Sequence, residues 1–176
     1  MNPLKTCFLI TLVTFSLVMC KTETKTEKHP FDATFTGVYT SVDQDVSACG
    51  EYPWVRVIND GNGTDAILGK FTHHFDFCAD MDSGFYPGKQ MAAYLIDENN
   101  DTLFISSAGR VMGGRMDDHP EHVISFWRDP FKIMGGTGRY AGASGSGMTD
   151  DYNSSLDTNS HHHWVGTIVL AAEKKN

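Results

Sequence analysis

The 176-residue sequence predicts an all-β protein whose folded part is a single eight-stranded antiparallel β-barrel. Short segments rich in β-branched and aromatic residues follow one another along the chain, and turn residues separate them. No segment carries a convincing 3.6-residue apolar repeat of an amphipathic helix. Six glycines lie within residues 135–147, directly after the mainly apolar segment 131–134, as expected where a strand meets a tight corner. The sequence indicates neither an internal repeat nor a second domain.

Strands are predicted at short spacing, which is typical of an antiparallel barrel or sandwich. The predicted strands are residues 35–42, 54–58, 66–80, 90–97, 102–109, 123–129, 131–134 and 161–172. NDGNG and ENND are predicted as chain reversals, and Pro130 as a bend or edge position. Residues 110–122 and 150–160 are predicted as polar loops.

The segment 66–80 alternates between two faces, as a half-buried strand does. The face predicted to enter the core carries Ile67, Gly69, Phe71, His73, Phe75 and Phe77, and the opposite face carries Leu68, Lys70, Thr72, His74 and Asp76. His73 is then either a hydrogen-bonded core histidine or a general base in a ligand cavity. If a cavity exists, its predicted lining is Phe71, His73 and Phe75, with Tyr39, Trp54 and Arg56 placed by the same alternation.

The N-terminal 19 residues are predicted to be a signal peptide of the lipoprotein type. Lys5 precedes an apolar core of 13 residues that is too short to be a stable membrane anchor. Leu17-Val18-Met19-Cys20 resembles a bacterial lipobox, in which Cys20 would be lipidated, although Met19 stands where a small residue is usual. The alternative is an ordinary cleaved signal peptide. We therefore expect an exported protein anchored by lipid to a membrane of the cell envelope, on the periplasmic or outer-membrane side, or alternatively a secreted protein.

Residues 20–33 are expected to be the lipidated cysteine and a solvated tether, because they hold too few apolar side chains to offset their ordering entropy. Residues 34–172 then form the barrel, and residues 173–176 form a tail. Without residues 1–19 the chain has 13 basic residues (14 minus Lys5) and 22 acidic residues, a net charge of −9. This charge argues against nucleic acid as a partner. The expected partner is the bilayer, through the acyl anchor.

Two cysteines remain in the expected barrel, Cys49 and Cys78. In an exported protein they are predicted to form a disulfide. The alternative is two separate buried thiols.

The glycine-rich segment contains Gly136-Thr137-Gly138-Arg139-Tyr140-Ala141, which matches the form G-x-G-x-x-A of a dinucleotide fingerprint. A phosphate-binding loop must open a helix inside a βαβ unit, and the residues that follow are poor helix formers. The nucleotide interpretation is therefore rejected, and no cofactor is expected.

The same segment resembles the GGTG-x-F/Y-x-x-A-x-G signature of the allene oxide cyclase and dirigent protein barrels, which are calycin-like, and of exported bacterial proteins with that barrel. The matching residues are Gly135, Gly136, Thr137, Gly138, Tyr140, Ala143 and Gly145. The resemblance implies an eight-stranded barrel with an apolar interior, often assembled as a homotrimer. It carries over no catalytic residue. It implies glycines that let the chain cross a barrel corner, and Tyr140 as the plug of that corner. If Gly136 needs a positive φ at this corner, its replacement by Val should be strongly destabilising.

Histidines at 161–163 suggest a metal site, but no further ligands follow at fixed spacing, so no metal is predicted. His162 is in phase with the apolar residues of its strand. The function predicted from the sequence is non-enzymatic binding of a small apolar ligand or partner by an anchored barrel. The alternative is an isomerase or cyclase acting on an apolar, fatty-acid-derived substrate. A cavity above roughly 300 Å3 with a buried carboxylate or His73 at its floor would favour the alternative.

Overall fold

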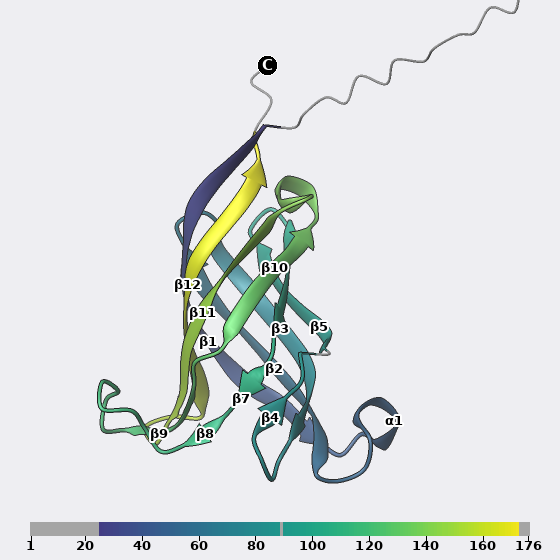
Figure 1. Cartoon of the computed structure of the whole chain (residues 1–176), viewed down its shortest axis with the longest axis vertical. Helices are drawn as coiled ribbons and strands as arrows, with labels where there is room; N and C mark the ends of the chain where they lie inside the picture. The colour runs from purple at the N-terminus through teal and green to yellow at the C-terminus, as the bar shows by residue number, and fades with distance from the viewer. Residues whose placement is uncertain (1–24, 89, 173–176) are drawn as a thin grey trace, which may run out of the picture.

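The computed structural model describes residues 25–88 and 90–172, and within them the chain forms a closed antiparallel barrel (Figure 1). Eight strands form the ring in the order β10–β6–β5–β3–β2–β1–β12–β11, and pairing between β11 and β10 closes it. The predicted fold class is therefore confirmed. The strand bounds are β1 Thr26–Asp43, β2 Trp54–Asp65, β3 Gly69–Asp80, β5 Gln90–Asp97, β6 Thr102–Ser107, β10 Pro130–Gly136, β11 Ser144–Ser154 and β12 Asn159–Ala171.

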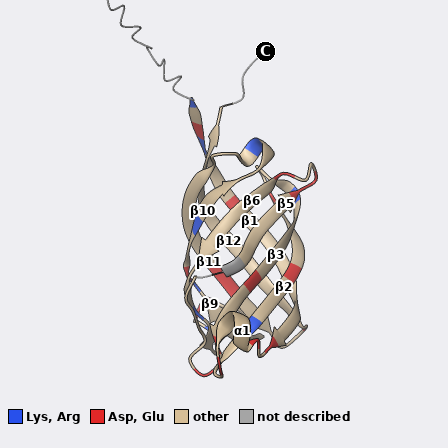
Figure 2. Cartoon of the chain, turned by 90° about the vertical axis from the view of Figure 1, so that its right-hand side faces the viewer, with Lys and Arg blue, Asp and Glu red and all other residues tan. Residues whose placement is uncertain are grey.

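The two ends of the barrel differ. At the end that we call the terminal end, β1 begins and β12 stops, beside the 3-10 helix η1 (Gly138–Tyr140). The other end, the loop end, carries the short elements between the ring strands. The strands that form the wall are tilted relative to the long axis of the barrel (Figure 2). These elements are α1 (Val46–Cys49), β4 (Phe85–Tyr86), β7 (Gly109–Arg110), β8 (Met112–Gly113) and β9 (Val123–Trp127). Within the described part of the chain, no helix is both long and apolar enough to cross a membrane.

Strand β1 begins at Thr26, inside the segment that was expected to be a tether. Its first residues pair with the end of β12, from Thr26 opposite Ala171 onward. Phe31 and Ala33 are fully buried, so this part of the chain gains both a strand partner and core contacts. The tether prediction is wrong for residues 26–33 because it considered composition alone. Residues 1–24, which include Cys20, and the predicted tail at 173–176 lie outside the described residues.

Strand β2 continues through NDGNG, so the predicted reversal at these residues is wrong. Gly61 and Gly63 lie so close to β1 that a Cβ on Gly61 would sit 1.9 Å from the carbonyl oxygen of Thr36. These glycines therefore allow a close approach of two strands. The chain reverses at residues 66–68 instead, and Asp65 Oδ1 accepts hydrogen bonds there from the backbone N–H groups of Ile67 and Leu68. Leu68 is buried in this turn, contrary to its predicted place on the polar face.

The predicted strand 123–129 is found as β9, outside the ring, and the eighth ring strand is β11, which was not predicted. β11 covers much of the predicted polar loop at 150–160 and pairs with β12 along ten residue pairs. Its first part pairs with β10 and its last part with β9. Arg128 and Asp129 separate β9 from β10, and of these two strands only β10 pairs with β6.

The core occupies the half of the barrel next to the terminal end. It is built from inward side chains of β1, β3, β5, β6, β10 and β12 together with η1. Its largest fully buried side chains are Tyr140, Phe31, Phe131, Leu95, Leu103 and Ile168. Phe131 stacks on Trp164 with ring centroids 5.0 Å apart, and Trp164 stacks on Phe75 at 5.6 Å. The predicted inward face of β3 is confirmed for Phe71, His73 and Phe75, which are all buried.

The glycine-rich corner lies between β10 and β11 and holds η1. Gly135, Gly138 and Gly142 have positive φ, whereas Gly136 does not, so the condition stated for Gly136 is not met. Gly136 is needed for space instead, since a Cβ there would lie 2.1 Å from the carbonyl oxygen of Thr102. Tyr140 is fully buried, as predicted for a plug of the corner, and its hydroxyl donates to Asp97 at 3.0 Å.

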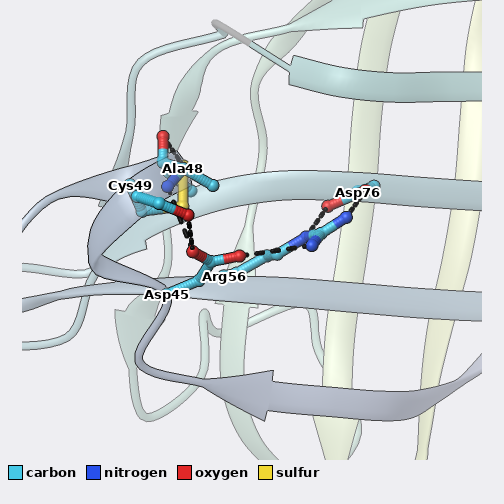
Figure 3. The surroundings of a disulfide bond; sticks show 7 residues. Asp45, Ala48, Cys49, Arg56 and Asp76 are labelled. Carbon is cyan, nitrogen blue, oxygen red and sulfur yellow. Dashed lines mark hydrogen bonds and ion pairs between the residues drawn. A yellow bond between two sulfur atoms is a disulfide. The ribbon is translucent and has the colours of Figure 1, made fainter.

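The predicted disulfide between Cys49 and Cys78 is present, and it ties α1 to β3. Asp45 caps α1 by accepting a hydrogen bond from the N–H of Ala48 at 3.1 Å. Arg56 lies between Asp45 and Asp76 beside the disulfide, and its guanidinium donates two hydrogen bonds to Asp76 (Figure 3). This ion-pair chain fastens the α1 loop to the outside of the barrel wall.

Candidate ligand cavity in the barrel

The half of the barrel next to the loop end contains a cavity of about 80 Å3. A buried water needs roughly 10–15 Å3, so the cavity has room for roughly five to eight waters or for one small molecule. It is smaller than the roughly 300–1,000 Å3 of sites that enclose drug-sized ligands. Aromatic side chains form much of its wall, and they are Tyr39, Phe75, Phe77, Tyr86, Trp127 and Trp164.

Residues of the loop end close the cavity. Tyr86 on β4 donates a hydrogen bond from its hydroxyl to Asp129, which holds its ring at the cavity, and burial raises the pKa of Tyr86. Val111, between β7 and β8, completes this cover. Tyr39 also lines the cavity, and its side chain is partly exposed. Its hydroxyl donates to Asn153 at 3.1 Å.

Asp151 supplies a carboxyl group to the cavity wall. It lies on β11, directly opposite His162 of β12, and its side chain is 1% exposed. The indole N–H of Trp164 donates to both carboxyl oxygens at 3.0 Å, and Nδ1 of His162 lies 3.3 Å from Oδ1. Burial raises the pKa of Asp151, because the apolar surroundings disfavour its charged form. A carboxyl group with a raised pKa therefore lies in an aromatic cavity.

A polar chain runs from Asp151 across the barrel interior to His73. Nε2 of His162 lies 2.8 Å from Oγ of Ser160, Asn59 Nδ2 donates to the same oxygen at 3.0 Å, and Nε2 of His73 lies 2.8 Å from Asn59 Oδ1. Burial, helped by the neighbouring His162, lowers the pKa of His73 to about 3. His73 is therefore uncharged at neutral pH, and it stands as a hydrogen-bonded core histidine.

Ser160, His162 and Asp151 follow the order of a nucleophilic triad: serine Oγ to histidine Nε2, and histidine Nδ1 to carboxylate. The serine is unsuited to attack a substrate. It is fully buried and does not line the cavity, and its hydroxyl is engaged by Asn59, His162 and the carbonyl of Gly37. The three residues therefore act as part of the interior polar chain.

The structure separates the residues proposed from the sequence as cavity lining. Tyr39 and Phe75 line the cavity, whereas Phe71 packs in the core and His73 belongs to the polar chain. Trp54 and Arg56 lie on the other face of β2, because Val55, Val57 and Asn59 are the residues that point inward. Arg56 is engaged there by Asp76 and Asp45.

Sequence reasoning missed Asp151, Tyr86 and Trp127. Asp151 was placed in a polar loop because the stretch around it is rich in Asp, Asn and Ser. The signal that could have identified it is the two-residue spacing of Gly147, Thr149 and Asp151, which places these positions on one face of a strand. The neighbouring strand carries His162 and Trp164 at the same two-residue spacing. Among the described residues, no group of three or more His, Cys, Asp or Glu side chains is placed to hold a metal ion.

Comparisons with known proteins leave the family open. No family model matches the chain, and no curated protein matches it. The solved structures that resemble it include two dirigent proteins. The pterocarpan synthase dirigent protein GePTS1 has a TM-score of 0.48 and 16% identity, covering 95% of this chain and 100% of that one. For the pterocarpan synthase dirigent protein PsPTS1 the TM-score is 0.46 and the identity 14%, covering 85% of this chain and 97% of that one. The strand order of the chain itself shows an eight-stranded antiparallel barrel, the architecture that the resemblance of its glycine motif implied.

Proposed function

We propose that the barrel binds a small, largely apolar molecule in the cavity at its loop end. The observation that carries this proposal is the cavity itself, which is walled by six aromatic rings and holds one buried carboxyl group, Asp151. Aromatic walls with few polar groups are typical of small-molecule sites. Asp151 would orient the polar group of the ligand, since among the described residues it supplies the one carboxyl group that lines the cavity.

Filling the cavity should abolish ligand binding. Ala79 on β3 lines the cavity, so Ala79→Phe places a ring inside it, whereas Thr72→Phe places the same ring on the exposed face of the same strand. Native mass spectrometry of protein purified from its own host is expected to show a bound small molecule on the natural protein and on Thr72→Phe. Its occupancy on Ala79→Phe should fall at least tenfold. Equal occupancy on both variants would contradict the cavity as the binding site.

An isomerase or cyclase is the second candidate. The cavity of about 80 Å3 is smaller than the roughly 300 Å3 that would favour it, but its buried carboxyl group supports it. The raised pKa of Asp151 gives the cavity a carboxyl group that can keep and deliver a proton. The recovered ligand distinguishes the candidates. After incubation in D2O, a binding protein returns the ligand with its C–H bonds unchanged. Proton transfer by Asp151 would introduce deuterium at carbon, and Asp151→Asn should stop that exchange.

A lipid anchor on Cys20 is part of the proposal, although Cys20 lies outside the described residues. Replacing Cys20 by Ala should release the protein from membranes, because the thioether to the lipid cannot form. Membrane fractionation of the natural protein and of Cys20→Ala measures this. A membrane fraction that stays unchanged in the variant contradicts the anchor.

The proposed homotrimer concerns the outer face of the barrel. Met134, Met148 and Val165 are each about half exposed there, on β10, β11 and β12, and Met148 pairs with Val165. Exposed apolar side chains that lie side by side, as Met148 and Val165 do, are a feature of protein contact surfaces. The same native mass spectra report the number of chains per particle.

A further inference from the structure

We propose that the cavity selects a small organic ammonium ion, held between the carboxylate of Asp151 and the faces of the surrounding aromatic rings. This inference rests on the proposed binding function and names its ligand class. Two independent features of the cavity support it. No Lys or Arg among the described residues lies beside Asp151, and the cavity is lined by aromatic rings, which attract cations.

The buried carboxyl groups of the chain show what is unusual about Asp151. Asp76 is paired with Arg56, Asp97 with Arg139 at 2.8 Å, and Asp65 accepts hydrogen bonds from three backbone N–H groups. Asp151 is at least as buried as any of these. Among the residues that the structure describes, no Lys or Arg lies within 4.0 Å of its oxygens, and its one basic neighbour is His162.

The hydrogen bonds to Asp151 leave part of its capacity unused. An ionised carboxylate offers about four acceptor positions, and the indole N–H of Trp164 occupies one position on each oxygen. Nδ1 of His162 lies near enough to Oδ1 of Asp151 for an ion pair, but it makes no hydrogen bond. A positive charge in the cavity would therefore meet an incompletely satisfied carboxylate, and it would stabilise the ionised form.

Aromatic rings supply the second attraction. The faces of Trp, Tyr and Phe carry negative electrostatic potential and attract cations, and aromatic cages that bind quaternary ammonium groups use this effect. Trp127 and Tyr86 line the cavity from the loop end and are the rings available to a cation there. Trp164 and Phe75 line it from the core side, where they stack on each other. Such a site favours an organic cation over a metal ion, because a metal needs several oxygen, nitrogen or sulfur ligands and the described residues offer no such group.

Choline and its uncharged carbon analogue 3,3-dimethylbutan-1-ol test the inference, since they have nearly the same shape and differ in charge. Binding is followed by calorimetry and by tryptophan fluorescence, which should change on binding because Trp127 and Trp164 line the cavity. We expect the full chain to bind choline at least tenfold more tightly than the alcohol. Asp151→Asn should remove this preference while the affinity for the alcohol stays the same. Choline binding should also be lost in Ala79→Phe, which separates the cavity from general attraction to an acidic surface.

Equal affinities, tighter binding of the alcohol, or no binding of either compound would overturn the inference. The proposed function is judged separately, by whether Ala79→Phe removes the ligand that copurifies with the protein. If Asp151→Asn fails to fold, Trp127→Leu serves instead, because it removes an aromatic face and keeps an apolar wall. This variant should weaken choline binding at least fivefold more than alcohol binding, and an equal loss for both compounds would contradict the aromatic cage.

Discussion

Replacing Tyr140 by Ala should lower the free energy of unfolding by about 3–5 kcal/mol, the range measured when large buried aromatic side chains are truncated. Tyr140 is fully buried at the glycine-rich corner and packs in the core with strands from both sides of the barrel. The truncation leaves a cavity that the ring of strands cannot close. It also removes the hydroxyl that donates to the buried carboxylate of Asp97. Urea unfolding followed by circular dichroism measures the change.

Tyr140→Phe is the matched control, because it removes the hydroxyl and keeps the ring. It should cost about 1–2 kcal/mol, the usual penalty for one lost hydrogen bond to a buried group. Asp97 keeps its ion pair with Arg139 and its bonds to the N–H groups of Asn99 and Asp101. If both variants lost the same stability, the plug would act through its hydroxyl alone, and the interpretation of the corner as a packed unit would fail.

The parts of the fold that the sequence predicted are those in which local pattern and global fold agree. In β3 the apolar side chains alternate strictly, so Phe71, His73 and Phe75 were placed in the interior from the sequence alone. His162 was placed correctly for the same reason. The disulfide followed from two cysteines expected in an oxidising compartment, and the structure confirms it. Periodicity of two residues carries this information because successive strand side chains face opposite sides.

The parts that were missed are those in which the partner strand decides the structure. Residues 144–154 are rich in Ser, Gly and Asp, which favour turns in isolation. In the protein they form β11, because β10, β9 and β12 offer strand edges on both sides. Residues 26–30 likewise become a strand only beside β12. Cross-strand pairing depends on neighbours distant in sequence, and a single sequence does not reveal them.

The same reason explains why the candidate site was only partly predicted. Tyr39 and Phe75 were identified from alternation, but the carboxyl group of the cavity lies on the strand that was missed. Tyr86 and Trp127 come from β4 and β9, which lie outside the ring. A cavity closed by such short elements is a property of the assembled loop end. Its chemistry therefore becomes visible only when the strands are placed together.

Removing the disulfide, by Cys49→Ser together with Cys78→Ser, should lower the free energy of unfolding by about 3–4 kcal/mol. The two cysteines are separated by 29 residues, and the bond limits the freedom of that loop in the unfolded chain. The native barrel should change little, because α1 buries no side chain and Arg56 still joins Asp45 and Asp76. Urea unfolding of the two proteins under oxidising conditions measures the difference.

Dithiothreitol provides the control, since it should destabilise the natural protein to the level of the double variant and leave the variant itself unchanged. The dependence of the unfolding free energy on urea concentration tests the cause. A cross-link that acts on the unfolded chain keeps it compact, so its removal should steepen this dependence, because more surface becomes exposed on unfolding. If stability fell without a steeper slope, the bond would act mainly by holding α1 against the native barrel. In that case, reduction should release the α1 loop while the cavity on the inner side of the wall keeps its ligand.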